Sequence, residues 1–368
     1  MTANLADVAR MAGVSEATAS RVMNGRRYVA ATTRLRVEDA ARQLDYVPHR
    51  AARDLSMART ATVALLVHHA QYPAHGEGTF SSRVVDGVSR RLRAARYDLL
   101  YVTVDDDAMD RLAGLAAARP GRTDGVLVLG PSFPREAVTR LVDLGRPVVA
   151  IDGRHDGVDA VLADNREPMR RLARHLVHDH GYRRLACLAG PRSWPSTAER
   201  IAGARAAVRG SGATLRVLHA SETTIRDGAE LATPLADDPP DAVVAVNDAM
   251  AIGAIHRLRS LDPMRRPAIT GFDDIAWAQL TDPPLTTVAV AAEAIGSTAV
   301  DLLLSRIAAP EPSAQPAREV RVPATVRLRR SCGCGEPLHP LPDHDVGGAA
   351  LPSVRPERTV TRGGGSQR

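Results

Sequence analysis

The first fifty residues carry apolar side chains at helical spacing in two short runs separated by Gly13. The first run follows Asn4, which with Asp7 makes a variant of the capping box, and Gly13 fits the left-handed position that ends a helix. Ser15 caps the second run, and a third helix is predicted at about residues 32–44. These helices would share a small core made of Leu5, Val8, Ala9, Ala12, Ala19, Val22, Met23, Val37, Ala40, Ala41 and Leu44.

From about residue 61 the pattern changes to short apolar runs that alternate with helical stripes. The runs are rich in Val and Leu and predict strands at residues 62–67, 98–104, 125–129, 147–151, 184–189, 215–219, 242–246 and 267–271. The stripes predict helices at residues 80–96 and at about 165–180, 196–210, 224–236 and 247–260. This alternation is typical of parallel sheets that helices cover on both faces. We therefore predict two α/β lobes with a cleft at the carboxyl ends of their strands.

The composition fits a globular chain of more than one domain. Its 368 residues exceed one typical core, and 44% hydrophobic with 24% charged residues is ordinary for a soluble protein. No apolar run approaches the roughly 18–20 residues that span a bilayer. The N-terminus lacks the pattern of a secretory signal, and three cysteines do not make a disulfide framework. We expect a cytoplasmic protein with no membrane partner.

The positive charge is concentrated in the helical N-terminal part. Residues 1–60 contain ten arginines and six acidic residues, so they carry +4 of the net charge of +6. The outward face of the second predicted helix combines short polar side chains with Arg21. Short side chains let a helix approach base edges in the major groove, where arginine can pair with guanine. The pattern favours double-stranded DNA as a partner over a basic surface with no partner.

Several motifs resemble the LacI/GalR family of transcription regulators. The matching headpiece runs are LADVA at 5–9, AGVS at 12–15 and ATASRVMNG at 17–25, and the match continues at 33–34, 37, 44, 46–48 and 51–55. The two lobes resemble the periplasmic-binding-protein-like core of the same family, so the resemblance covers about residues 3–331. Ala30 departs from the pattern, because a serine often caps the third helix there. The resemblance implies an all-α helix-turn-helix headpiece on an α/β two-lobed core, acting as an effector-controlled repressor.

The resemblance also implies which residues contact DNA. Base edges would be contacted by Glu16, Ala17 and Arg21, although Glu16 could equally point to solvent. Phosphates would be contacted by Thr18, Ser20, Asn24, Thr33 and Tyr46. Ala52 and Leu55 of the hinge segment would enter the minor groove, with packing of Leu55 against the body as the alternative. Two headpieces of a homodimer would require a palindromic operator.

Polar residues at or just past strand ends are the candidate effector ligands. By resemblance the best are Asp152, Arg200, Asn247 and Asp273, and a loop or helix-cap role is the alternative for each. Such groups suit a small ligand with many hydroxyls, such as a sugar or sugar derivative. Aromatic walls would come from Phe80, Trp194 and Trp277, although the tryptophans could instead pack in a core or lid. Asn165, Asp248 and Asp274 are expected to cap helices.

These expectations divide the chain into four parts. The headpiece is 1–48, the hinge 49–60, the effector-binding and dimerisation core 61–331, and a disordered tail 332–368. Within the core, lobe 1 would take about 61–161 and 290–318, and lobe 2 about 162–289 and 319–331.

No enzymatic activity, cofactor or metal is expected. The sequence lacks a phosphate loop, a GxSxG elbow and a nucleophile with an evident base. His68, His69 and His75 match no zinc spacing, and Cys332-Gly-Cys334 is interpreted as a fortuitous pair. An α/β cleft could also belong to an enzyme or to a sugar-binding transport protein, and neither alternative explains the headpiece.

Overall fold

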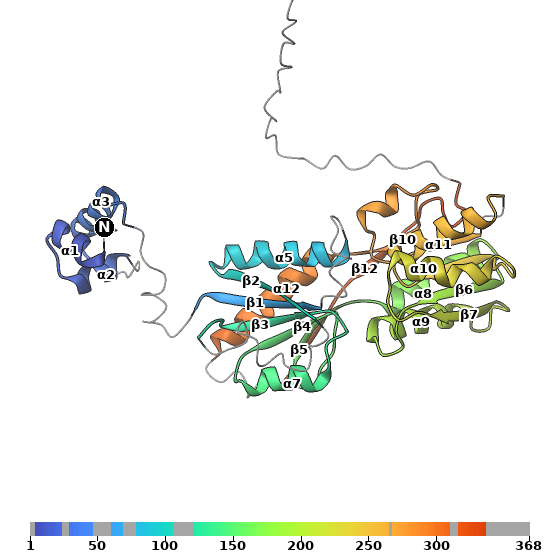
Figure 1. The fold of residues 1–368 in the computed structure, drawn as a ribbon, viewed down its shortest axis with the longest axis horizontal. Helices are drawn as coiled ribbons and strands as arrows, with labels where there is room; N and C mark the ends of the chain where they lie inside the picture. Colours follow the sequence, from blue (N-terminus) through green and yellow to red (C-terminus); the bar gives the residue numbers. More distant parts are fainter. Residues whose placement is uncertain are drawn as a thin grey trace, which may run out of the picture. The chain divides into compact units, whose positions relative to one another are not determined.

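The computed structural model describes residues 4–23, 29–46, 60–68, 79–105, 121–264, 267–309 and 316–335. The N-terminal unit consists of α1 (Leu5–Ala12), α2 (Glu16–Met23) and α3 (Ala31–Gln43), drawn in blue in Figure 1. The capping box of α1 is confirmed, since Asn4 and Asp7 each accept a hydrogen bond from the other's backbone N–H. Gly13 ends α1 at φ 63°. At the start of α2 the N–H of Thr18 donates to the hydroxyl of Ser15.

The three helices share the small core that the sequence predicts. Its buried members are Val8, Ala9, Ala12, Ala19, Val22, Val37, Ala40 and Ala41. Several of these are alanines, so the helices can approach closely around a few larger side chains. The headpiece therefore has an apolar core of its own, separate from the clusters of the body.

Lobe 1 contains a sheet of six parallel strands in the described part of the chain, ordered β11-β5-β4-β3-β1-β2. The strands are β1 (Thr62–His68), β2 (Asp98–Val104), β3 (Gly125–Leu129), β4 (Val148–Ile151), β5 (Asp159–Ala163) and β11 (Glu319–Val322). Alternate residues of β1 face opposite sides, as the period of a strand requires. Val63, Leu65 and Val67 pack with α5 (Phe80–Ala94) and α12 (Ala292–Ala308). Ala64 and Leu66 pack with α7 (Arg135–Asp143) on the other face (Figure 1).

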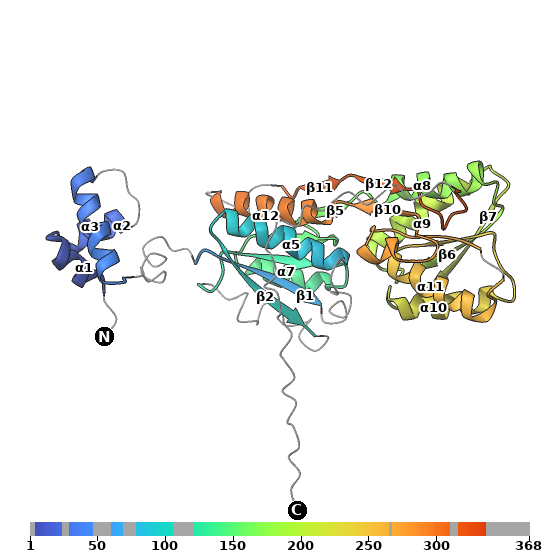
Figure 2. The same cartoon turned by 90° about the horizontal axis from the view of Figure 1, so that it is seen from above.

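Lobe 2 contains a smaller parallel sheet, ordered β7-β6-β8-β9 among the described strands. The strands are β6 (Arg184–Ala189), β7 (Thr214–His219), β8 (Ala242–Ala245) and β9 (Ala268–Thr270). One face packs against α8 (Arg166–Arg174) and α9 (Pro195–Val208). The other packs against α10 (Ile225–Ala232) and α11 (Asp248–Leu261), as Figure 2 shows. A π-turn, η4 (His175–Asp179), follows α8, and two short 3-10 helices are η5 (Thr233–Leu235) and η6 (Ala276–Gln279).

Three chain segments connect the lobes. The chain leaves lobe 1 after β5, returns to it after β10 (Thr287–Val290), and leaves again between β11 and β12 (Ala324–Arg327). β10 and β12 pair in antiparallel fashion. The predicted elements agree closely with those observed, because strands buried on both faces appear in the sequence as continuous apolar runs.

The sequence analysis assigned residues 319–331 to lobe 2, and the structure shows that this assignment is wrong for the first of these residues. β11 pairs in parallel with β5 and therefore belongs to the sheet of lobe 1. A short strand of alternating character can extend the edge of either sheet, so its pattern does not say which lobe it joins. Cys332, assigned to the tail, is 0% exposed within the apolar core of the body. Residues 336–368 lie outside the described part.

Among the described residues, no helix is both long and apolar enough to cross a membrane.

Candidate DNA-binding face and ligand cavity

The outward face of α2 carries the residues predicted to contact base edges. Glu16, Ala17 and Arg21 are exposed, whereas Ala19 and Val22 on the opposite side are buried. The predicted phosphate contacts that the structure describes are partly exposed, namely Thr18, Ser20, Thr33 and Tyr46. The remaining predicted contacts, Asn24, Ala52 and Leu55, lie outside the described residues. Ala30 supplies no side-chain cap to α3, as expected.

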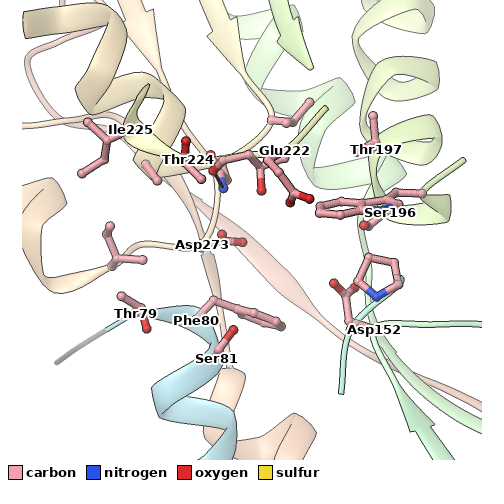
Figure 3. Close-up of a pocket in the computed structure, with 18 of the residues that line it drawn as sticks. Thr79, Phe80, Ser81, Asp152, Ser196, Thr197, Glu222, Thr224, Ile225 and Asp273 are labelled. Carbon is pink, nitrogen blue, oxygen red and sulfur yellow. Dashed lines mark hydrogen bonds between the residues drawn. The ribbon is translucent and has the colours of Figure 1, made fainter. Parts of the chain in front are cut away.

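A cavity of about 330 Å³ has walls from both lobes. This volume lies at the lower end of the range for small-molecule sites, roughly 300–1,000 Å³. All seven residues predicted to bind an effector line it, namely Phe80, Asp152, Trp194, Arg200, Asn247, Asp273 and Trp277. Figure 3 shows the ring of Phe80 and the carboxylates of Asp152 and Glu222 around one central space, with Asp273 beside it.

Arg200 is a buried cation in the cavity wall. It is 7% exposed and sits on α9, from which its guanidinium stacks on the ring of Phe272 at 3.8 Å. Its Nε donates to Oδ1 of Asn165 at 2.8 Å and its Nη1 to the carbonyl of Val246 at 2.6 Å. These contacts fix the guanidinium and leave its Nη2 3.5 Å from Oδ1 of Asp273. Arg200 is thus preorganised to donate to a ligand oxygen.

Asp152 and Asp273 present carboxylates that are buried and incompletely paired. Oδ1 of each has no hydrogen-bond partner among the described residues, since the 3.5 Å approach of Arg200 to Asp273 lacks hydrogen-bond geometry. Both residues also have positive φ, 55° and 109°, which is unfavourable for a side chain other than glycine. Backbone strain together with unpaired buried acceptors is typical of functional sites.

Burial changes the protonation of both carboxyl groups. Burial raises the pKa of Asp152 to about 6, although the charge of Arg200 opposes this shift. Burial raises the pKa of Asp273 to about 7, again against Arg200, and the neighbouring charge of Asp152 raises it further. Either group can therefore exchange a proton near neutral pH, and a ligand hydroxyl could donate to the ionised form.

Asn247 lines the cavity and also caps α11. Its Oδ1 accepts from the N–H of Met250 at 2.9 Å, and its Nδ2 donates to the carbonyl of Thr223 at 2.9 Å. The cap role that the sequence offered as the alternative is therefore present. One N–H of the amide still remains for a ligand, because the amide nitrogen carries two.

Three residues expected to cap helices have other contacts. Asn165 makes no side-chain cap to α8 and instead holds Arg200. Asp248 is fully buried and accepts from the N–H of Ile275 and the hydroxyl of Thr287. Asp274 accepts from Arg329 at 2.7 Å. A short polar residue before a helix is typical of a helix cap. The local sequence pattern contains no information about contacts with distant residues, so it could not predict these partners.

The aromatic residues form the less polar walls. Phe80 begins α5 and is partly exposed, Trp194 precedes α9, and Trp277 in η6 is 41% exposed. The sequence interpretation missed several polar lining residues: Thr79, Ser81, Ser196, Thr197, Glu222 and Thr224. Glu222 and Thr224 follow the carboxyl end of β7, so the rule that located Asp152 would have found them too.

Comparison with known proteins matches both parts of the chain. A family model described as bacterial regulatory proteins, lacI family, matches residues 4–49, and one for a periplasmic binding protein-like domain matches residues 173–332. The Ribose operon repressor of Escherichia coli (strain K12) is 33% identical over 322 residues, which cover 84% of this chain and 94% of that protein.

Two solved structures are similar over nearly their whole length. The transcriptional regulator CelR in complex with cellobiose has a TM-score of 0.64 and 29% identity, with 89% of this chain and 99% of that chain covered. The lac repressor dimer bound to operator and the anti-inducer ONPF has a TM-score of 0.76 and 24% identity, with 90% and 99% covered. The similarity to the lac repressor is evidence for the fold alone, because the identity is low.

A helix-turn-helix headpiece joined to a two-lobed core with a polar cavity defines the class of ligand-controlled transcription regulators. Within that class, the chain belongs to the lacI family of bacterial regulatory proteins.

Proposed function

We propose that this protein is a repressor that binds a palindromic DNA operator as a homodimer and whose operator affinity is set by a small effector. The observation that carries the proposal is the cavity with walls from both lobes, in which Arg200 meets two carboxylates that each have one buried oxygen without a hydrogen bond. Relatives named Ribose operon repressor and HTH-type transcriptional repressor PurR, and a lac repressor dimer bound to operator, support DNA binding and dimerisation. A repressor that acts on DNA would be cytoplasmic.

The effector would be a polyhydroxylated molecule of sugar size. A hydroxyl can donate to a carboxylate and accept from a guanidinium, so one ligand could satisfy Arg200, Asp152 and Asp273 together. The aromatic walls suit the apolar face of a sugar ring. Similar structures hold cellobiose and ribose, which supports this ligand class. The role proposed for the cavity is binding, without catalysis.

The test is operator affinity measured with and without ligand. Genomic fragments that the chain binds tightly identify the operator, and Arg21→Ala should weaken that binding by about 1–3 kcal/mol and relax the choice of one base pair. A thermal-shift screen of sugars then identifies the effector. Arg200→Ala should abolish the effector response while effector-free operator affinity stays within twofold of wild type.

Arg205→Ala is the matched control for the ligand site, because Arg205 lies on the same helix with its side chain exposed. This variant should respond to the effector as wild type does. A full response in Arg200→Ala would place the effector outside the cavity. Absence of any tightly bound fragment would contradict the proposed repressor function itself.

A further inference from the structure

Two histidines and two cysteines, far apart in the sequence, lie together in lobe 2. His175 begins the π-turn after α8 and His180 directly follows it, and Cys332 and Cys334 follow β12 near the end of the described chain. One ligand atom from each lies within 4.8 Å of the other three, and no other such group of four is found among the described residues. None of them lines the ligand cavity. We call these residues the His₂Cys₂ cluster.

The three distances among Cys334, His175 and His180 agree with the edges of a metal tetrahedron. Sγ of Cys334 lies 3.5 Å from Nε2 of His175 and 3.4 Å from Nε2 of His180, and the two nitrogens are 3.1 Å apart. Zinc bonds of about 2.3 Å to sulfur and 2.0–2.1 Å to nitrogen give tetrahedral edges of about 3.5 Å and 3.3 Å for these pairs. A cation bonded to these three atoms would therefore need only small movements of their side chains, and Sγ of Cys332 lies within 4.8 Å of each of them.

The backbone at both ends brings the ligand atoms together. The N–H of His180 donates to the carbonyl of His175 across the π-turn, which places side chains five residues apart on one side. Between the cysteines, Gly333 has φ 101°, and a Cβ there would lie 2.7 Å from the hydroxyl of Tyr182. That hydroxyl donates to the carbonyl of Cys332 and so holds the Cys-Gly-Cys loop.

Outer contacts orient the ligands as they do in metal sites. Nδ1 of His175 lies 2.7 Å from Oδ2 of Asp179, which leaves Nε2 directed at the cluster. A carboxylate on the far nitrogen of a ligating histidine is a recurring feature of zinc sites. The hydroxyl of Thr286 donates to Sγ of Cys332 at 3.1 Å, a bond that a thiolate would strengthen. Cys332 is fully buried, and the other three residues are partly buried.

We propose that the His₂Cys₂ cluster binds one zinc-like divalent transition metal ion. Two thiolates and two imidazoles are ligands that zinc prefers, and four protein ligands make a closed, structural site. Binding releases the two thiol protons and joins the end of α8 to the chain after β12. The ion therefore holds the last described segment against lobe 2. It connects histidines and cysteines that are more than 150 residues apart in the sequence.

The test is metal content of the full chain purified through a tag without histidines. Mass spectrometry of the metal should find about one zinc per chain in wild type. Cys334→Ser and His180→Ala should each retain less than a tenth of that amount. After exchange for cobalt, wild type should show the intense visible bands of tetrahedral cobalt–thiolate coordination, and Cys334→Ser should lose them.

Two controls match the ligands in residue type. His178 is exposed on the same π-turn and Cys187 is buried in β6, and neither belongs to the cluster. His178→Ala and Cys187→Ala should keep the full metal content and the cobalt bands. The proposal is wrong if the reduced wild-type chain takes up neither zinc nor cobalt, or if it is isolated with a Cys332–Cys334 disulfide that binds no metal after reduction. Equal loss of metal in the controls would also contradict it.

Discussion

Asp273 is a residue whose protonation differs strongly between the folded and the unfolded chain. Its carboxyl has an ordinary pKa of 3.8, and burial raises the pKa to about 7 in the fold. Between about pH 4 and 7 the folded chain therefore binds more protons at this position than the unfolded chain does. Stability contributed by Asp273 is then highest below about pH 4 and falls as pH rises through that window.

Asp273→Asn should remove this pH dependence while keeping the shape of the side chain. The quantity to compare is the unfolding free energy of the variant minus that of wild type. This difference should increase by about 2–3 kcal/mol from pH 5 to pH 7.5, since each pKa unit corresponds to about 1.4 kcal/mol. Urea unfolding without effector at both pH values measures this difference. Asp282→Asn, on a side chain that is 82% exposed, is the matched control and should change by less than half as much. If the difference in unfolding free energy between Asp273→Asn and wild type does not vary with pH, Asp273 remains ionised beside Arg200.

Pairs of helices in both lobes approach through glycine. A Cβ at Gly296 of α12 would lie 2.2 Å from the carbonyl oxygen of Val84 in α5, and one at Gly87 would lie 2.1 Å from that of Glu293. In lobe 2, a Cβ at Gly253 of α11 would lie 1.9 Å from the carbonyl oxygen of Ile225 in α10. These contacts are with backbone, which cannot rotate away as a side chain can.

Gly296→Ala should therefore separate α5 from α12. In an ordinary helix this change stabilises by about 1 kcal/mol, but here overpacking should destabilise the chain by about 1–3 kcal/mol. Ala294→Gly at an exposed position of the same helix measures propensity alone and should cost about 1 kcal/mol. Thermal and urea unfolding compare the two. A stabilised Gly296→Ala chain would show that the helices separate without loss.

The sequence predicted the helices and strands better than it predicted which distant residues and strands they contact. Apolar runs and helical stripes located the predicted strands and helices to within a few residues, because burial of a strand or a helix face leaves a local pattern. The sequence did not predict β5, β10, β12, α7 or α12. Asn165, β11 and the His₂Cys₂ cluster were misassigned or missed, since each depends on a residue or strand more than 30 positions away. The cavity was predicted well because the carboxyl ends of parallel strands converge, a property of topology that the order of elements already contains.

At the scale of the whole molecule, charged residues join the two lobes beside the cavity. Glu199 on α9 of lobe 2 accepts from Arg154 of lobe 1 at 2.8 Å and from Arg321 of β11 at 2.9 Å. These two guanidinium groups outweigh the effect of burial and lower the pKa of Glu199 to about 2. Arg154 also holds Glu319 of β11. A change in the angle between the lobes would have to stretch or break these ion pairs.

Glu199→Gln should alter the coupling between effector and operator. Coupling between two sites is the ratio of operator affinities with and without effector, and residues in a connecting network change it by about 0.5–2 kcal/mol. We expect a change of about three- to tenfold in that ratio, kept moderate because the partners are partly exposed and screened by solvent. Operator titrations at saturating effector and without effector give the ratio directly.

Glu167→Gln is a stringent control for this prediction. Glu167 also binds two arginines, Arg170 and Arg171, which lower its pKa to about 2. All three residues lie within α8, so these ion pairs do not connect the lobes. The coupling ratio of Glu167→Gln should match that of wild type. Raising the salt concentration should reduce the difference in coupling ratio between Glu167→Gln and Glu199→Gln. Equal effects of Glu167→Gln and Glu199→Gln would mean that net charge, rather than the connection between lobes, determines the response to effector.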